Sequence, residues 1–317
     1  MEIISNPSQV EIKKAAQALM DGHLVAFPTE TVYGLGADAT NEKAVSSVYL
    51  VKGRPTDHPL IVHISSIKQL AKWAVDIPEY AIKIAKEFWP GPMTLILKRS
   101  EIAKNFITGG QENVGVRVSS HPVALALLNE FEKLGGFGIA APSANRFGAV
   151  SPTSSAHVKE DLEQFLREGD IIIDGGKCLV GIESTIIDCT KKIVRILRPG
   201  SISLKQIEMI AGINIVSEMS TNNVRSPGML EFHYSPKAHV VLDVQANLGE
   251  GFIAMENIPT PNGAIRLSSP NSIEQYAKEL YAALRSGDQR GITKIVVIQP
   301  KGAGLAESIR DRLGKMR

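Results

Sequence analysis

Four stretches of the sequence place polar side chains where a protein core would exclude them. Residues 28–36 (PTETVYGLG) follow an apolar run and combine hydroxyl groups with glycines, which suits either a small polar ligand or an ordinary turn. Lys52 and Arg54 follow a run with helical spacing, where cations either complement the helix dipole or bind phosphate. Residues 142–145 (PSAN) follow a short apolar run, so they form either a plain loop or a ligand site at a strand end.

The fourth stretch, residues 112–119 (ENVGVRVS), alternates as a half-buried strand does. Its three valines take one face, and Asn113 and Arg117 share the other. An arginine on a central strand, flanked by Gly and Ser, either pairs with a core carboxylate or holds the carboxylate of a ligand.

Several common kinds of site have no support in the sequence. No GxxxxGK[ST] or GxSxG motif is present, and neither cysteine has an obvious histidine partner, so neither a P-loop nor covalent catalysis is indicated. The GxGxxA match at 136–141 precedes a strand instead of following one, unlike a dinucleotide-binding loop. His58 and His63 are five residues apart, a spacing that favours neither one helix face nor one strand face, so a two-histidine metal site is not expected.

The composition is that of a globular protein of about two domains. The chain has 317 residues, of which 44% are hydrophobic and 21% charged, with a net charge of +2. Residues 1–205 have a net charge of +1 (23 Lys+Arg against 22 Asp+Glu), residues 206–235 of −2, and residues 236–317 of +3. None has the basic excess of a dedicated nucleic-acid-binding domain.

The sequence predicts no passage into or across a membrane. No stretch approaches the roughly 18 uninterrupted apolar residues of a membrane span, and the N-terminus lacks a basic segment followed by an apolar run. Two cysteines, Cys178 and Cys189, are too few for a disulfide framework and are not spaced as a zinc motif. We therefore expect a cytoplasmic protein.

Strand and helix patterns alternate along the chain and predict an α/β fold with two domains. Helices are expected over residues 8–21, 41–51, 66–74, 78–88, 121–131, 154–168, 272–286 and 305–313. Strands are expected over residues 23–27, 59–64, 93–98, 112–119, 138–141, 171–174, 184–190, 193–197, 238–244 and 293–299. We predict a twisted, mixed parallel and antiparallel sheet in residues 1–205, a linker at 206–235, and a smaller Rossmann-like domain at 236–317.

One pair of strands allows a geometric prediction. Residues 190–192 join two strand patterns as a hairpin loop. With a three-residue loop, Ser184 faces Arg198 across the ladder, at about 5 Å between side chains. A two-residue loop would shift this register by one.

The polar stretches belong to longer blocks that resemble one family. FPTETVYGLG, KGRPTDHPLIVHI, WPGPMTLIL, ENVGVRVS, APSAN with SPT, GIESTIID and ILRPG are similar, in order and spacing, to the YrdC-like domain of the threonylcarbamoyl-AMP synthase family. SPGMLEFHYSP, at 226–236, resembles the linker of the long form, and the remaining tail resembles its C-terminal domain. The linker departs from the family at Leu230, Glu231 and Phe232, where basic and aromatic residues are usual.

The resemblance implies a nucleotidyltransferase. L-threonine, bicarbonate (or CO2) and ATP, with Mg²⁺ as its companion ion, would give L-threonylcarbamoyl-AMP and pyrophosphate. A separate tRNA threonylcarbamoyl transferase complex would then modify the adenosine 3′ of the anticodon in tRNAs that read codons beginning with A. The implied partners include at most weak contact with RNA and none with a membrane.

The resemblance also implies roles for individual residues, with no protein ligand to a metal. Those implied to bind threonine are Thr31, His63, Arg117, Ala141 through its backbone, and Ser184. Those implied to bind ATP or AMP are Lys52, Arg54, His58, Asn113, Ser143, Asn145, Ser151, Arg198 and Tyr234. Lys52 and Arg54 would face the phosphates as catalytic residues, and Arg117 would hold the threonine carboxylate. Tyr234 would close over the nucleotide, unless the linker is only a tether.

Two other functions fit parts of the pattern. A YrdC-like module could bind RNA in the same concavity without catalysis, but the near-neutral charge of residues 1–205 disfavours it. A YrdC-like domain also occurs in a carbamoyltransferase of hydrogenase maturation. That protein needs an acylphosphatase-like region and paired CxxC motifs, which this sequence lacks.

Overall fold

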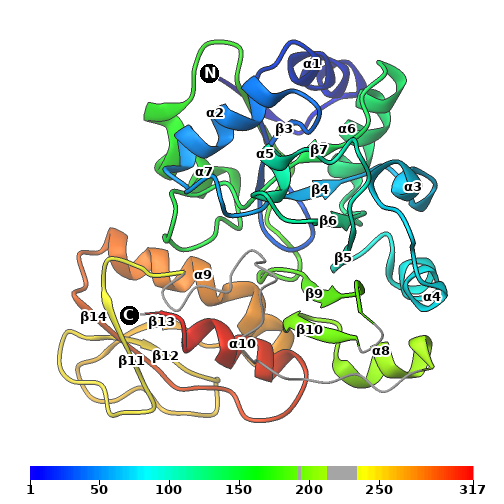
Figure 1. The fold of residues 1–317 in the computed structure, drawn as a ribbon. Helices are drawn as coiled ribbons and strands as arrows, with labels where there is room; N and C mark the ends of the chain where they lie inside the picture. Colours follow the sequence, from blue (N-terminus) through cyan, green and yellow to red (C-terminus); the bar gives the residue numbers. More distant parts are fainter. Residues whose placement is uncertain (192–193, 213–233, 317) are drawn as a thin grey trace.

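The computed structural model describes residues 1–191, 194–212 and 234–316. Within these ranges, ten strands form one mixed sheet and four later strands form a second, parallel sheet (Figure 1). The strands are β1 (Glu2–Ser5), β2 (Val25–Phe27), β3 (Gly34–Asp38), β4 (Ile61–His63), β5 (Met93–Lys98), β6 (Asn113–Arg117), β7 (Ile139–Ala140), β8 (Ile171–Asp174), β9 (Thr185–Asp188), β10 (Arg195–Arg198), β11 (His239–Leu242), β12 (Gly251–Ile253), β13 (Ile265–Ser268) and β14 (Lys294–Val297). The helices are α1 (Gln9–Met20), α2 (Glu42–Lys52), η1 (Ile67–Gln69), α3 (Leu70–Trp73), α4 (Glu79–Phe88), α5 (Asn105–Thr108), α6 (Pro122–Lys133), α7 (Ser155–Leu162), η2 (Glu163–Phe165), α8 (Leu204–Ala211), α9 (Ile273–Gln289) and α10 (Leu305–Leu313).

The large sheet has the order β1-β8-β2-β3-β7-β4-β6-β5-β9-β10. β4 and β6 are parallel neighbours near its middle, and β7 and β5, on their outer sides, run antiparallel to them. The small sheet has the order β11-β14-β12-β13. The predicted fold class, a mixed sheet followed by a smaller Rossmann-like unit, is confirmed.

The two faces of the large sheet bury different hydrophobic clusters. On β2, Val25 and Phe27 pack with α1 and α6, whereas Ala26 points into the larger core on the opposite face. α1 and α6 pack against each other over the β1–β2 end of their face. Further along that face, β4 and β6 present His63 and Arg117, and the pocket described below lies there.

The second part of the chain shares a hydrophobic core with the first. α10 lies between the small sheet and β10, and α9 lies between the small sheet and the part of the first domain near α7 (Figure 1). Val150 and Ile182 belong to the same buried cluster as Tyr281 of α9 and Ile309 of α10. Apolar side chains from two parts of the chain that are far apart in sequence are therefore buried against each other, and this burial stabilises the contact between the two parts.

One glycine brings the two backbones into direct contact. Gly181 has φ +82°, and a Cβ built on it would lie 2.4 Å from Cα of Lys278 on α9. No side chain fits between the two segments at this point, so any other residue would force them apart.

Three details differ from the sequence-based predictions. Residues 28–36 could have formed an ordinary turn, but the last residues of this stretch belong to β3. Its glycines serve close packing, because a Cβ on Gly36 would lie 2.7 Å from the Ile139 side chain. α8 extends to Ala211 and buries Ile207, so residues assigned to the start of the linker are helical. β1, β12 and β13, each of three or four residues, were not predicted, because so short a run leaves little periodic pattern.

The register expected for a three-residue hairpin loop is wrong; next to the loop the pairing is shifted by one, as the two-residue alternative allows. Ile196 pairs with Ile187, and after a bulge Arg198 pairs with Ile186, so Ser184 has no partner across the ladder. Arg198 nevertheless reaches Ser184 with its long side chain. Residues 192–193 of the connecting loop lie outside the described residues.

Candidate active site

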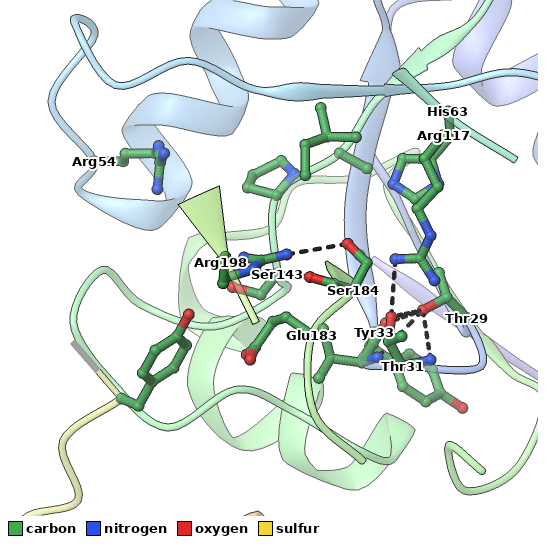
Figure 2. Close-up of a pocket in the computed structure, with 16 residues that line it drawn as sticks. Thr29, Thr31, Tyr33, Arg54, His63, Arg117, Ser143, Glu183, Ser184 and Arg198 are labelled. Atoms are coloured by element: carbon green, nitrogen blue, oxygen red, sulfur yellow. Dashed lines mark hydrogen bonds between the residues drawn. The ribbon is translucent and has the colours of Figure 1, made fainter. Parts of the chain in front are cut away.

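A pocket of about 560 Å3, including its part open to solvent, lies against the middle of the large sheet (Figure 2). It is lined by Thr29, Thr31, Val32, Tyr33, Gly34, Arg54, Ile61, His63, Arg117, Ala141, Pro142, Ser143, Glu183, Ser184, Arg198 and Tyr234. These residues come from the loop before β3 and from its first residue, from the loop after α2, and from β4, β6 and β10. The others come from segments next to β7 and β9 and from the segment before β11. Nine residues that the sequence comparison implied are brought together here: Thr31, Arg54, His63, Arg117, Ala141, Ser143, Ser184, Arg198 and Tyr234.

The parallel pairing of β4 and β6 sets two of these side chains next to each other. His63 is opposite Arg117, and Ile61 is opposite Gly115, so all four lie on one face. The valines of β6 fill the core on the other face, as the alternation predicted.

Arg117 is buried and already has a carboxylate partner. Its Nη2 lies 2.7 Å from Oε1 of Glu30, and its Nη1 donates to the Thr31 hydroxyl at 3.0 Å (Figure 2). Burial alone would raise the pKa of Glu30, but Arg117 and the Ser119 hydroxyl hold it below its ordinary value. Of the two interpretations left open by the sequence, pairing with a core carboxylate is therefore realised. The Nε of Arg117 has no hydrogen-bond partner among the described residues, which leaves a buried donor for a ligand.

His63 is held as a neutral imidazole. It is 3% exposed, and burial, aided by Arg117, lowers its pKa to about 3. Its Nδ1 has no hydrogen-bond partner within the described part of the chain. At neutral pH the ring therefore offers one donor and one acceptor without adding charge.

Two further arginines give the pocket its positive character. Arg198 donates from Nε to the Ser184 carbonyl at 3.0 Å and from Nη2 to the Ser184 hydroxyl at 3.1 Å. Arg54 donates to the Pro59 carbonyl at 3.1 Å and lies 5.6 Å from the Phe147 ring centre. Burial lowers the pKa of Arg54 to about 10, so it remains a cation at neutral pH.

Glu183 is a pocket residue that the sequence analysis missed. It is buried, and although burial alone would raise its pKa, Arg312 and Arg198 lower it to about 2. Thr29, Tyr33 and Glu30 were also missed. Glu30 directly precedes Thr31, and Glu183 directly precedes Ser184, within the motifs quoted above. A search for acidic residues in these motifs would have found both.

Five implied residues do not line this pocket, and three of them support its walls. Nζ of Lys52 donates to the carbonyls of Ser143 and Asn145, at 2.5 Å each. Nδ2 of Asn145 donates to the Arg146 and Ala149 carbonyls at 2.8 Å. Ser151 donates to Glu183 at 2.6 Å.

The other two lie to the side. Asn113 shares the strand face of Arg117 but lines a smaller recess with Gln111, which adjoins the pocket at Ile61. The His58 ring packs edge-on to Phe147, at 5.4 Å between ring centres.

The tyrosine of the linker is buried at the pocket rim. The Tyr234 ring stacks on Tyr281 of α9, at 5.9 Å between centres, and lies 5.5 Å from the Arg312 guanidinium carbon. Residues 213–233, which hold the rest of the predicted lid, including Leu230, Glu231 and Phe232, lie outside the described residues.

Neither a resident metal centre nor a membrane span is found in the described part of the chain. There, no three His, Cys, Asp or Glu side chains gather as metal ligands. None of the helices described combines the length and apolar character needed to cross a bilayer. Both cysteines are buried and free.

Comparison with known proteins identifies the family. Residues 17–200 match the Sua5/YciO/YrdC family, described as "Telomere recombination", and residues 202–316 match "Threonylcarbamoyl-AMP synthase, C-terminal domain". The threonylcarbamoyl-AMP synthase of Pyrococcus abyssi is 41% identical, over 96% of this chain and 93% of its own length. This chain belongs to the threonylcarbamoyl-AMP synthase family.

Other relatives in the family agree. The Bacillus subtilis threonylcarbamoyl-AMP synthase is 39% identical over 99% of this chain and 94% of its own length. A crystal structure of P. abyssi Sua5 complexed with L-threonine is 37% identical with a TM-score of 0.88, covering 99% of this chain and 98% of that one. The resemblance drawn from the sequence motifs is thus confirmed, as is the prediction of an enzyme of the nucleotidyltransferase type.

Proposed function

We propose that this protein joins L-threonine, bicarbonate (or CO2) and ATP into L-threonylcarbamoyl-AMP, releasing pyrophosphate, with water as a further product when the carbon source is bicarbonate. The observation that carries the proposal is the convergence of three buried arginines, Arg54, Arg117 and Arg198, on one pocket lined with hydroxyl groups. The substrates are anionic at both ends, as a carboxylate and a triphosphate, and planar guanidinium groups suit both. The names of the family relatives point to the same reaction.

The two sides of the pocket suit different substrates. On one side, the free Nε of Arg117, the Thr31 hydroxyl and neutral His63 would bind the carboxylate and hydroxyl of threonine. On the other side, Arg54 and Arg198 would bind phosphate oxygens, and Ser184 lies between the two sides in Figure 2. A carbamate formed on the threonine nitrogen would then attack the α-phosphorus, with pyrophosphate as the leaving group.

The protein would act by positioning and by electrostatics. Negative charge develops on phosphate oxygens during phosphoryl and nucleotidyl transfer, and fixed cations in a site sheltered from water stabilise it. Lys52, whose amine is bound to two carbonyls, would maintain the Ser143–Asn145 wall in this scheme. Mg²⁺ would enter as the companion ion of ATP, since the pocket's one carboxylate, Glu183, is committed to protein partners within the described residues.

The product would serve tRNA modification in the cytoplasm. A separate transferase complex would move the threonylcarbamoyl group to the adenosine 3′ of the anticodon in tRNAs reading codons that begin with A. Family membership supports this assignment.

The decisive experiment varies the substrates one at a time. Purified protein with Mg²⁺-ATP should release pyrophosphate and AMP-linked product only when threonine and bicarbonate are both present. Omitting either should abolish pyrophosphate release. Release of ADP and inorganic phosphate would overturn the proposal, and salt-dependent RNA binding without ATP turnover would favour a binding module instead.

A further inference from the structure

Helix α10 of the second domain contacts the residue before Ser184 and the residue after Arg198. Arg312 is fully buried; its Nε donates to Oε2 of Glu183 at 2.8 Å, and its Nη2 donates to the Pro199 carbonyl at 2.9 Å. Glu183 directly precedes Ser184, and Pro199 directly follows Arg198. The Arg312 side chain, 129 residues away from Glu183, thus contacts the chain neighbours of both Ser184 and Arg198.

A second contact from the same helix holds the segment after Arg198. The Ser308 hydroxyl donates to the Gly200 carbonyl at 2.8 Å. A Cβ on Gly200 would lie 2.4 Å from the Thr185 nitrogen, so this segment packs closely on the start of β9. α10 therefore fixes the end of β10 against the start of β9, where Ser184 and Arg198 bond to each other.

Glu183 lines the pocket, but most of its acceptor sites are occupied by protein groups. Oε1 accepts from Ser151 at 2.6 Å and from Tyr281 at 3.3 Å. Oε2 accepts from Tyr281 at 3.0 Å and from Arg312. The single Tyr281 hydrogen is shared between the two oxygens, so three donors occupy most of the roughly four lone-pair sites of the carboxylate. Arg312 and Arg198 also lower the pKa of Glu183 to about 2, so contacts and charge together favour a positioning role over that of a base.

We propose that Arg312 and Ser308 are positioning residues that set the geometry of Ser184 and Arg198 from the second domain. The proposal rests on the proposed function in one respect, since the effect on catalysis presumes that Arg198 binds the reacting phosphates. Small displacements of such a cation are expected to reduce turnover strongly, because transition-state stabilisation depends on fixed geometry.

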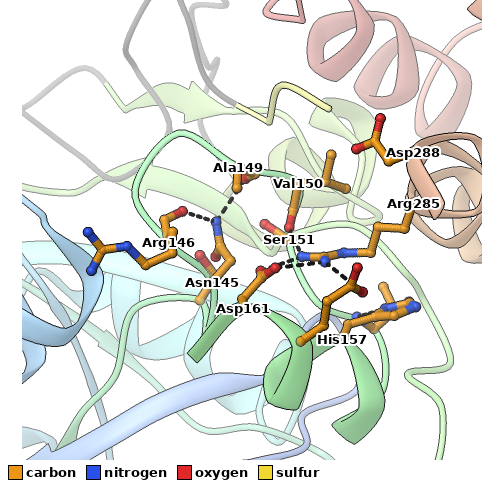
Figure 3. A network of polar contacts seen from close by, with 12 residues as sticks. Asn145, Arg146, Ala149, Val150, Ser151, His157, Asp161, Arg285 and Asp288 are labelled. Carbon is orange, nitrogen blue, oxygen red and sulfur yellow. Dashed lines mark hydrogen bonds and ion pairs between the residues drawn. The ribbon is translucent and has the colours of Figure 1, made fainter. Parts of the chain in front are cut away.

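The same interface supplies a matched control. Arg285 of α9 is also a buried arginine of the second domain, with an ion pair to Asp161 of α7 at 2.6 Å (Figure 3). It also donates to the Val150 carbonyl. Neither Asp161 nor Val150 lines the pocket. Replacing Arg285 should weaken the domain contact while the Arg312 contacts to Glu183 and Pro199 stay intact. Val150 directly precedes Ser151, which bonds to Glu183, so a small indirect effect on kcat is expected from this control as well.

The test compares Arg312→Met, Arg312→Lys and Ser308→Ala with Arg285→Met in the full chain. Melting temperature, kcat, the KM for ATP and amide hydrogen exchange are measured for each. We expect Arg312→Met to lower kcat about tenfold or more, and Arg285→Met to stay within roughly threefold at a similar loss of melting temperature. Arg312→Lys keeps the charge but cannot reach both Glu183 and Pro199 at once. Its melting temperature should therefore exceed that of Arg312→Met, while its kcat should stay low.

Amide hydrogen exchange measures how firmly the segments around Ser184 and Arg198 are held, and it does not require an active enzyme. In Arg312→Met and Ser308→Ala, exchange should rise at residues 184–186 and 199–203 and stay unchanged in β5. In Arg285→Met it should rise around 150–161 only. Should Arg312→Met fail to fold, Ser308→Ala and Arg312→Lys supply the same comparison.

Two results would overturn the proposal. One is an equal fall in kcat for Arg312→Met and Arg285→Met, and the other is unchanged exchange at 184–186 in every α10 variant. If the wild type makes no pyrophosphate, the proposed function fails and the exchange pattern alone decides the positioning role. If the wild type is active, the kinetic comparison applies as well.

Discussion

At the scale of single residues, the pocket's cations are bound to protein groups before a substrate arrives. Arg117 pairs with Glu30, and Arg198 donates to the Ser184 carbonyl and hydroxyl. A buried charge without such partners would be strongly unfavourable, so each cation is partly compensated in the empty site. The pairing also orients Arg117, whose Nε remains as a donor.

Replacement of Arg117 by lysine should separate the two substrates. An ammonium can pair with Glu30 but has no planar fork for Thr31 and a carboxylate at once. We expect Arg117→Lys to weaken threonine binding about tenfold or more and ATP binding much less, as measured by titration calorimetry. Arg99→Lys, at an ion pair with Glu112 away from the pocket, is the control. Equal losses for both ligands would mean that Arg117 is structural.

His63 should make stability depend on pH below neutrality. In the unfolded chain its pKa is about 6.5 and in the folded protein about 3, so the unfolded state binds the proton first as pH falls. Stability from this residue is complete above pH 6.5 and is lost progressively toward pH 3. At pH 5 the loss should reach about 2 kcal/mol.

Urea unfolding of wild type and His63→Gln between pH 7 and pH 5 measures this effect. The variant should lose less stability than the wild type over that range. His157, with a pKa lowered to about 4 by burial, acts in the same direction and remains in both proteins. Parallel curves would contradict the assignment of the slope to His63.

The sequence predicted well which residues would lie together in the pocket. It predicted less well which groups each of them would contact. Strand alternation placed Arg117 correctly on the face opposite the valines. It did not choose between a protein and a ligand carboxylate, because Glu30 lies 87 positions away in the chain. Lys52 was expected at the phosphates, and its two carbonyl partners belong to a loop about 90 residues further on.

At the scale of elements, tight backbone contacts determine where the pocket walls lie. The register of β9 and β10 depends on the length of the connecting loop and on a bulge before Arg198, and the strand pattern alone determines neither. The β3 glycines looked like turn residues, although they permit the Ile139 side chain to approach. Both errors arise because packing against distant segments overrides local preference.

Substitution of Gly181 should test the contact between its loop and α9. An alanine there would strain a positive φ and place its Cβ 2.4 Å from the Lys278 backbone. We expect Gly181→Ala to lower the free energy of unfolding by about 2 kcal/mol or more. Gly176→Ala, with φ +89° and nothing within 4 Å, isolates the backbone strain and should cost about half as much or less. Equal costs in denaturant unfolding would show that the contact with α9 contributes little.

At the scale of the whole molecule, the second domain completes the pocket. Tyr234 lines it while stacking on Tyr281, and their shared cluster includes Val32 of the pocket wall. The sequence indicated two domains, but it could not indicate that their cores merge. Such contacts involve residues of α9 and α10 that look like the ordinary apolar face of a helix.

Tyr234→Ala should therefore affect both stability and nucleotide binding. Loss of the ring removes its stacking on Tyr281, and if it covers the nucleotide, affinity for ATP should fall by about 1 kcal/mol or more. Proteolysis within residues 220–236 should also slow when ATP and threonine are added together. Unchanged proteolysis with saturating ligands, together with a fully active variant, would leave the linker as a tether.

The ion pair between Glu183 and Arg312 has a consequence for how such a pocket selects its ligands. Part of the charge that compensates Glu183, the acid on the pocket wall, comes from Arg312 of α10, so the electric field in the pocket depends on both domains being docked. If the pocket binds ATP as proposed, undocking of α10 would leave Glu183 less compensated, and its carboxylate would repel the triphosphate. Interdomain docking would then act as a counter-ion switch, in which nucleotide binding and domain closure favour each other by linkage.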